Sequence, residues 1–288
     1  MERFKSINKA ISVLKCFNSQ DLALSASEIS KKVGIHRVTS HRLLETLFRA
    51  GLLEKSAIKG KYSIGSELYV LGSLYLKTMD VIKVATPVVQ TINELTGEAV
   101  ALGILKNDSI IVVLREQSKH ALRFDTHVGS VWAAHATSTG KALLSNLSET
   151  ELDDLYPQEK LTTFTAKTIA TKTELKLELE QIRKAGVAYD LESNNEKYVG
   201  VASAVRDVNG RAVAALNIGI PIFRCREPLS LKRLAALVRK GSCLISYLYG
   251  YQDSENDICS IEEIRSLWKQ GKLCSELQTN TPVHDSVI

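Results

Sequence analysis

The sequence lacks the features of a disulfide-stabilised or membrane-spanning protein. Its five cysteines are odd in number, widely spaced and never arranged as CxxC, so we expect reduced thiols. The longest nearly apolar run, residues 212–223, contains Asn217 and Pro221 and falls short of the ~20 residues that a membrane-spanning helix needs. The first residues, MERFKSINK, lack the apolar core of a signal peptide, which predicts a cytoplasmic protein without a membrane partner.

A cluster of metal ligands and a complete catalytic set are also missing. His120, His127 and His135 are spaced by seven and eight residues without a nearby cysteine, so we expect neither a metal nor a cofactor. Ser138 and Lys141 have the spacing of a serine acyl-enzyme, but no Ser-Asp-Asn or Lys-Thr-Gly motif accompanies them. We therefore expect no enzyme, and an acyl hydrolase that uses these two residues is the alternative.

The 288 residues are 44% hydrophobic and 24% charged, which excludes disorder and predicts about two globular domains. The charge is uneven along the chain. Residues 1–62 carry 12 Lys and Arg against 5 Asp and Glu, whereas the other 226 residues carry 25 against 27. A small basic unit joined to a larger, slightly acidic one is typical of a polyanion-binding domain on a sensing or catalytic body.

The basic segment has the pattern of a helix-turn-helix. Residues 7–17 have helical apolar spacing, and Ser25 with Glu28 forms a capping box for a second helix. Gly34 separates this helix from a third one, residues 35–50. A basic hairpin follows it, with Lys55, Lys59 and Lys61 on or beside the turn. The order predicts a winged helix-turn-helix over residues 1–65, whose hairpin lysines contact DNA phosphates.

The third helix of this segment is expected to read DNA. One side is apolar, and the other carries Val38, Thr39, Arg42, Thr46 and Arg49, which suit the major groove. A solvated helix in which Arg42 pairs with Glu45 or Thr46 is the alternative. The predicted contacts to double-stranded operator DNA are Arg37, Val38, Thr39, Ser40, His41, Arg42, Lys59 and Lys61.

The rest of the chain predicts a linker, an α+β domain and a tail. Periodicity indicates a linker helix over 66–84, which is also a candidate dimer contact; packing only on its own domain is the alternative. Residues 85–250 alternate hairpins and helices, which favours an antiparallel sheet with helices. The tail, 251–288, is polar except for a capped amphipathic segment near 260–269, expected to dock as a short helix on its own domain or on a partner subunit.

Several separated motifs resemble the IclR family of bacterial transcription regulators over roughly residues 4–250. They include VGIHRVTSHRLL (33–44), GKYSIG (60–65), HATSTGKA (135–142), GVAYDLE (186–192) and VASAVRD (201–207). The resemblance implies a winged helix-turn-helix on a GAF-like effector-binding domain, assembled as homodimers or tetramers. It also implies a sequence-specific regulator controlled by a small effector. Ser138 and Thr139 are expected to begin a helix whose free amides and hydroxyls suit an anion, so we expect the effector to be organic-acid-like.

The resemblance places an effector pocket at Ser138, Thr139, Asp190, Gly200, Asn217 and Gly219. Four residues depart from the family pattern. Gly200 stands where Cys or Ser is frequent, Asn217-x-Gly219 replaces a frequent Ser-x-Ser, and Val38 replaces a frequent Ser in the recognition helix.

Overall fold

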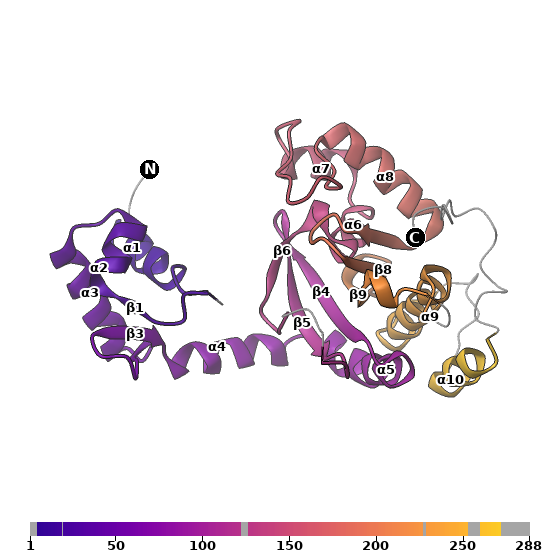
Figure 1. The fold of residues 1–288 in the computed structure, drawn as a ribbon, viewed down its shortest axis with the longest axis horizontal. Helices are drawn as coiled ribbons and strands as arrows, with labels where there is room; N and C mark the ends of the chain where they lie inside the picture. The colour runs from indigo at the N-terminus through magenta and orange to yellow at the C-terminus, as the bar shows by residue number, and fades with distance from the viewer. Residues whose placement is uncertain (1–4, 19, 122–125, 227–228, 253–259, 272–288) are drawn as a thin grey trace. The chain divides into compact units, whose positions relative to one another are not determined.

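The computed structural model describes the chain except residues 1–4, 19, 122–125, 227–228, 253–259 and 272–288. The chain divides into two compact units, Met1–Met79 and Asp80–Ile288 (Figure 1). Each unit has a hydrophobic core of its own. No helix among the described residues is long and apolar enough to cross a membrane.

The N-terminal unit is a group of helices edged by a small antiparallel sheet with the strand order β1-β3-β2. Val13, Ile29, Leu44 and Leu53 are fully buried in its core. The elements are α1 (Lys5–Leu14), β1 (Leu24–Ser25), α2 (Ala26–Val33), α3 (Arg37–Arg49), β2 (Leu53–Lys55), β3 (Lys61–Ile64) and α4 (Ser66–Lys77).

Local chemistry sets the turn between α2 and α3. The Ser25 hydroxyl accepts from the Glu28 amide at 3.3 Å, and the Glu28 carboxylate accepts from the Ser25 amide at 2.6 Å. At the other end of α2, Gly34 has a φ of +67°, a conformation that costs glycine little. The predicted capping box is therefore confirmed. Helices α2 and α3 and the β2–β3 hairpin together form the predicted winged helix-turn-helix.

The predicted single linker helix over 66–84 is wrong. Helix α4 ends at Lys77, and α5 runs from Asp80 to Thr96 with Pro87 inside it. Proline removes one backbone bond and costs about 3 kcal/mol in a helix interior. Burial of several aliphatic side chains, each contributing about 1.5–3 kcal/mol, outweighs this cost; these are Val81, Val88, Val89 and Ile92.

The C-terminal unit is built on a six-stranded antiparallel sheet with the order β6-β5-β4-β9-β8-β7, which confirms the predicted fold class. The hairpins at 106–108 and 208–210 are present. Its strands are β4 (Ala99–Lys106), β5 (Ser109–Glu116), β6 (Val131–Ala133), β7 (Ala188–Leu191), β8 (Tyr198–Arg206) and β9 (Ala212–Pro221).

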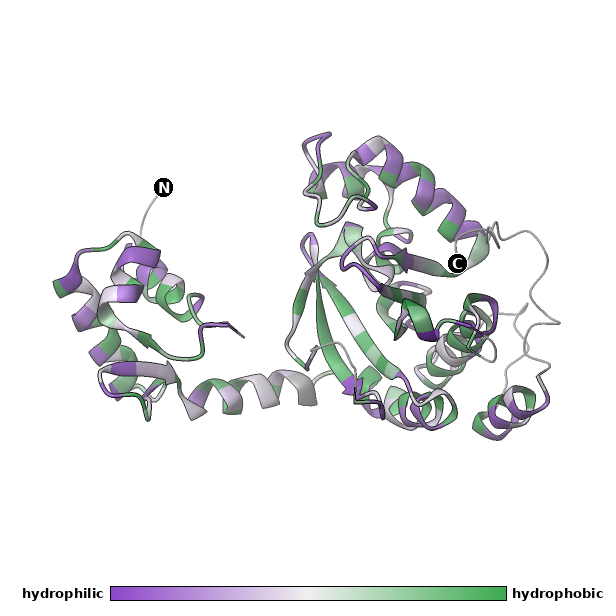
Figure 2. Ribbon diagram, in the orientation of Figure 1, coloured by the Kyte–Doolittle hydropathy of each residue, from purple (hydrophilic) through white to green (hydrophobic). Residues whose placement is uncertain are grey.

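Helices cover both faces of the sheet. Helices α5 and α9 (Leu231–Leu248) pack on one face, and α6 (Ser138–Leu144) on the other, with α8 (Lys172–Ala185) against α6. The strands are largely hydrophobic, whereas α8 alternates hydrophilic and hydrophobic residues (Figure 2). The short helix α7 (Glu149–Leu155) joins the α6 side through Leu152.

The two faces of the sheet differ in side-chain size. Alanines of β4, β7, β8 and β9 belong to the core cluster that contains residues of α6. Large buried side chains of the same strands, such as Leu102 and Leu216, lie outside that cluster. Small side chains allow a helix to approach a sheet closely. All seven residues of α6 are accordingly buried.

The described part of the tail contains helix α10 (Ile261–Lys269), which packs against α5 and α9. Ile264 is fully buried and Trp268 is 9% exposed. Arg265 donates to the Glu94 carboxylate at 2.6 Å, and the guanidinium of Arg233 lies 4.5 Å from the centre of the Trp268 ring. The apolar stripe of this helix thus covers its own unit.

Candidate nucleic-acid interface and ligand pocket

Helix α3 has one face in the core and one face open to solvent. The predicted contacts on its first turns are exposed or half buried, with the exception of Ser40: Arg37, Val38, Thr39, His41 and Arg42. Val38 is 64% exposed, which leaves its methyl groups available to a thymine methyl group. The face combines cationic, hydroxyl and apolar groups, the set that major-groove readers use.

Arg42 does not form the pairs that the solvated-helix alternative requires. Glu45 is paired with Arg49 at 3.2 Å, and the Thr46 hydroxyl donates to the Arg42 carbonyl instead. The Arg42 guanidinium makes no hydrogen bond or ion pair with any described residue. Its donors are therefore available to a base or a phosphate.

Ser40 is not accessible to DNA, so its prediction as a DNA contact is wrong. Its side chain is fully buried, and its hydroxyl donates to the Ala26 carbonyl at 3.1 Å. This bond joins α3 to the start of α2, so Ser40 positions the helix and does not lie on its outer face.

The hairpin lysines lie in three different environments. Lys59 is exposed at the turn. The Lys55 ammonium donates to the Tyr62 hydroxyl at 2.5 Å, and the Lys61 ammonium pairs with Glu28 at 3.1 Å. Hydrogen bonds from Ser25, with Lys61 beside them, lower the pKa of Glu28 to about 2, so this partner stays ionised. Lys61 thus joins β3 to α2.

The first turn of α6 and the facing strands enclose a small pocket of about 60 Å³. Five of the six predicted effector contacts line it: Ser138, Thr139, Asp190, Gly200 and Asn217. Strand pairing explains why segments far apart in sequence meet. Asp190 lies opposite Gly200, and Gly200 lies opposite Gly219 across β7, β8 and β9.

Gly200 allows α6 to approach the sheet. A Cβ atom at this position would lie 2.6 Å from the Ser138 hydroxyl and 3.3 Å from the Asn217 amide nitrogen. That amide donates to the Ser138 hydroxyl at 2.8 Å. Gly200 has no side chain to contact a ligand. Its lack of a Cβ atom instead leaves room for the hydrogen bond between Asn217 and Ser138.

Asp190 supplies a buried carboxyl group. It is 4% exposed and accepts from the amides of Ser193 at 2.7 Å and Asn194 at 3.3 Å. Burial raises its pKa to about 6, although the nearby charge of Lys141 and the amide bonds act in the opposite direction. Asp190 can consequently change its protonation state close to neutral pH.

Ser138 and Lys141 are not arranged as a nucleophile and its base. The Lys141 ammonium is buried and paired with Glu178 of α8 at 2.5 Å. The Ser138 hydroxyl accepts from Asn217. In addition, the N-cap of α6 is Thr137, whose hydroxyl accepts from the Gly140 amide at 3.1 Å. These partners give no support to the acyl hydrolase alternative.

Gly219 is not in the pocket lining, which corrects the prediction for this position. A Cβ atom there would overlap the Tyr198 hydroxyl, so Gly219 makes room for the Tyr198 ring. Tyr198 lies two residues before Gly200 on β8, and the period of two along a strand would have pointed to it. Further lining residues that the sequence reasoning missed are Arg115, Thr126, Trp132, Asn194 and Asn195.

His120, His127 and His135, the three candidate metal ligands, do not lie in a cluster of metal-ligating side chains in the described part of the chain. No group of three or more His, Cys, Asp or Glu able to hold a metal occurs among the described residues. His135 is buried, with its Nε2 atom 2.8 Å from the Thr162 carbonyl oxygen. Its role is structural, since it connects the segment before α6 to the loop before α8.

A winged helix-turn-helix with an open recognition face, joined to a sheet unit with a small pocket that several polar side chains line, defines a DNA-binding transcription regulator with an effector-binding domain. The family comparison gives the same result. The IclR helix-turn-helix domain matches residues 6–57, and the bacterial transcriptional regulator IclR C-terminal domain matches residues 73–247. The chain belongs to the IclR family.

Curated relatives are similar over most of their length. The chain is 32% identical over 251 residues to the HTH-type transcriptional regulator XynR of Escherichia coli K12, covering 87% of this chain and 99% of XynR. It is 27% identical over 248 residues to the acetate operon repressor of Salmonella typhimurium, covering 85% and 90%.

Solved structures share the fold. The Thermotoga maritima IclR structure has a TM-score of 0.68 at 24% identity, covering 86% of this chain and 100% of that one. An IclR homolog from Microbacterium hydrocarbonoxydans, complexed with 4-hydroxybenzoate, has a TM-score of 0.73 at 22% identity, covering 85% and 99%.

Proposed function

We propose that the pocket of about 60 Å³ binds a small organic acid, and that its occupancy controls operator binding by α3. The observation that carries this proposal is the convergence of Ser138, Asp190 and Asn217 on one pocket together with Arg115. Hydroxyl and guanidinium groups donate to a carboxylate, and a protonated Asp190 donates as well. The relative complexed with 4-hydroxybenzoate supports the acid class.

The effector displaces lining side chains as it enters. Ligand pockets commonly measure about 300–1,000 Å³, so a pocket of about 60 Å³ is smaller than such ligands need in the present conformation. The half-buried Tyr198 lies in the lining and stands over Gly219. A ligand that moves this side chain changes the packing of α6 against the sheet, and a change of this kind provides a signal to the DNA-binding unit.

A thermal-shift screen of the full chain against small organic acids, sugar acids and aromatic acids tests this proposal. An effector at 100 times its dissociation constant adds about 2.7 kcal/mol of stability. We expect Asp190→Ala to abolish that shift and to retain operator binding. The matched control is Asp154→Ala, an exposed carboxylate of α7 outside the pocket, which should respond as the wild type does. A full response in Asp190→Ala would remove Asp190 from the effector site.

The chain acts without catalysis in this proposal, as a homodimer or tetramer in the cytoplasm, where chromosomal DNA lies. The absence of turnover is supported by the ion pair that holds Lys141 on Glu178. Hydrolysis of ester or amide substrates by the purified chain, lost in Ser138→Ala, would instead favour the acyl hydrolase.

A further inference from the structure

The small pocket of the C-terminal unit needs a wall that moves. Its volume of about 60 Å³ is well below the about 300 Å³ at which ligand pockets commonly begin. Most of its lining residues belong to strands of the sheet or to the first turn of α6, a helix that is buried throughout. Asn194 and Asn195 lie instead in the loop that joins β7 to β8, residues 192–197 (the β7–β8 loop).

The backbone of the β7–β8 loop is strained at both ends. Glu192 has a φ of +66° and Lys197 a φ of +62°. In this left-handed region the Cβ atom of a residue other than glycine approaches its own backbone too closely. Strain of this kind persists only where the surrounding contacts impose it, and it is common at ligand clamps and switch regions. The loop therefore keeps its shape through its contacts and not through the preference of its backbone.

Asp190 holds the side of the loop that faces the pocket. Its Oδ1 atom accepts from the Ser193 amide at 2.7 Å and from the Asn194 amide at 3.3 Å. Asp190 and Asn194 both line the pocket. When the loop moves away, Asp190 loses these two bonds and becomes free to bond a ligand in their place.

Residues 165–168, which precede α8, hold the loop from its other side, and we refer to them as the clasp. The Thr168 hydroxyl donates to the Ser193 carbonyl at 2.5 Å and accepts from the amides of Phe164 and Thr165, both at 2.9 Å. Thr168 is 7% exposed, so solvent has little access to these bonds. A single buried hydroxyl thus ties the clasp to the backbone of the loop.

The rest of the clasp is closer to solvent. The Lys167 ammonium pairs with the Glu192 carboxylate, and the Thr165 hydroxyl donates to the Glu192 carbonyl at 2.8 Å. The Glu192 carboxylate also accepts from the Lys197 amide at 2.7 Å, which joins the two strained ends of the loop. Because the Lys167 side chain is about half exposed, solvent screens its ion pair. The buried bond from Thr168 is therefore the more important contact of the clasp.

We propose that the β7–β8 loop is the moving wall of the small pocket, which the Thr168 hydroxyl holds in place and which swings away from Asp190 to admit a ligand. The purpose of this movement rests on the proposed function of the pocket as an effector site. The loop ends beside Tyr198, a lining residue and the first residue of β8, and α6 packs on this strand. A displaced loop consequently alters the strand on which α6 packs.

Thiol labelling of the full chain tests the moving wall without any effector. Thr139→Cys places a thiol in the pocket lining, and the probe is iodoacetamide, with the rate at each cysteine read by mass spectrometry of peptides. Adding Thr168→Val, which removes the hydroxyl from a side chain of similar shape, should raise the rate at the introduced thiol by about fivefold or more, as loss of one hydrogen bond allows. Thr168→Ser keeps a hydroxyl and should leave the rate as it is in Thr139→Cys alone.

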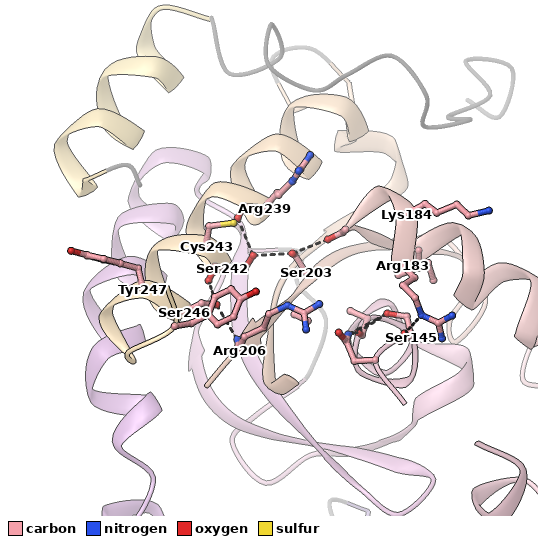
Figure 3. Close-up of a pocket in the computed structure, with 16 residues that line it drawn as sticks. Ser145, Arg183, Lys184, Ser203, Arg206, Arg239, Ser242, Cys243, Ser246 and Tyr247 are labelled. Atoms are coloured by element: carbon pink, nitrogen blue, oxygen red, sulfur yellow. Dashed lines mark hydrogen bonds between the residues drawn. The ribbon is translucent and has the colours of Figure 1, made fainter. Parts of the chain in front are cut away.

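Three controls accompany this measurement. Thr163→Val is the matched variant, because Thr163 is an exposed threonine just outside the clasp. Cys243 of α9 lines a separate cavity of about 330 Å³ that shares no lining residue with the small pocket (Figure 3). Cys225 is 1% exposed, so its labelling reports unfolding. Thr163→Val should leave the rate at the introduced thiol unchanged, and the rates at Cys243 and Cys225 should be the same in every variant.

Hydrogen exchange of the same proteins should become faster across residues 192–197 in Thr168→Val only. A bond with a purely structural role would lower the melting temperature and leave the labelling rate unchanged. An unchanged rate in Thr168→Val, an equal rise in Thr163→Val, or a rise that Cys225 shares would each overturn the proposal. Since no effector enters this experiment, the moving wall can fail while acid binding stands, and the acid screen with Asp190→Ala can fail while the loop still moves.

Discussion

At the scale of single residues, the buried carboxyl group of Asp190 makes the stability of the protein depend on pH. Burial raises its pKa from the ordinary 3.8 to about 6, so the folded state holds this proton more tightly than the unfolded chain. The protonated Asp190 stabilises the fold fully at pH values below the pKa of this group in the unfolded chain, 3.8. This stabilisation is lost as the pH rises through about 6, the pKa of Asp190 in the folded protein. Asp190→Asn keeps an oxygen for the Ser193 and Asn194 amides without the buried charge.

We therefore expect Asp190→Asn to be more stable than the wild type at about pH 8, by on the order of 3 kcal/mol, and equal to it below about pH 4. Melting curves recorded across this range provide the measurement. Asp154→Asn should follow the wild type throughout. Parallel curves for wild type and Asp190→Asn would contradict a raised pKa for Asp190.

If Asp190 contacts the effector as proposed, the same carboxyl group should couple effector binding to proton uptake. An ionised Asp190 repels a bound carboxylate, whereas a protonated one donates to it. We expect the affinity for an organic acid to rise as pH falls from about 7.5 through 6, with uptake of a proton on binding. Calorimetry in buffers of different ionisation enthalpy measures this uptake, and binding without proton uptake would show that the acid lies away from Asp190.

At the scale of elements, α3 carries exposed residues that we expect to read DNA and one buried residue, Ser40, that positions the helix. Arg42→Ala should weaken operator binding by about 1–3 kcal/mol if Arg42 contacts a base. Ser40→Ala removes the bond to the Ala26 carbonyl, so it should lower stability and leave the affinity of the folded protein nearly unchanged. Fluorescence anisotropy with operator DNA and thermal melting distinguish the two effects. The opposite pattern would reject the assignment of the α3 face.

Helix α10 is held to its unit mainly by its apolar stripe. Ile264 is fully buried, whereas Arg265 and Glu94 form a pair that is about half exposed. Ile264→Ala should lower the free energy of unfolding by about 2–5 kcal/mol or release α10, and Arg265→Ala should have little effect because solvent screens the pair. Melting curves and hydrogen exchange across α5 and α10 test this, and a larger loss in Arg265→Ala would contradict it.

At the scale of the whole molecule, α4 is the surface through which we expect two chains to associate. It exposes five large apolar side chains, Tyr69, Val70, Leu71, Leu74 and Tyr75, with Tyr69 80% exposed. An exposed apolar helix face of this kind is typical of an interaction surface. We expect two copies to pair through α4 and to place two α3 helices on an inverted-repeat operator.

The variants Leu71→Glu and Leu74→Glu should dissociate the dimer and weaken operator binding, as measured by sedimentation velocity and footprinting. Leu177→Glu is the matched control, because this leucine of α8 is 60% exposed outside α4. Association unchanged in both α4 variants, or protection of a single asymmetric half-site, would reject this arrangement.

Sequence reasoning was most successful where the determining contacts are local. The capping box of Ser25 and Glu28 joins residues three positions apart, and Gly34 ends α2 through its own φ, so the sequence by itself determined the helix-turn-helix. The two hairpins of the sheet follow from turns of a few residues in the same way. Family motifs then indicated five residues that line the small pocket of the C-terminal unit.

Only the tertiary structure decided features that depend on burial and on distant partners. Burial of aliphatic residues carries α5 through Pro87, and packing against α2 turns Ser40 from an expected DNA contact into a buried donor. The Tyr198 ring fills the space beside Gly219, which does not line the small pocket. Contacts of this kind join residues far apart in the chain, and their energy comes from packing and desolvation, which no local pattern of residues records.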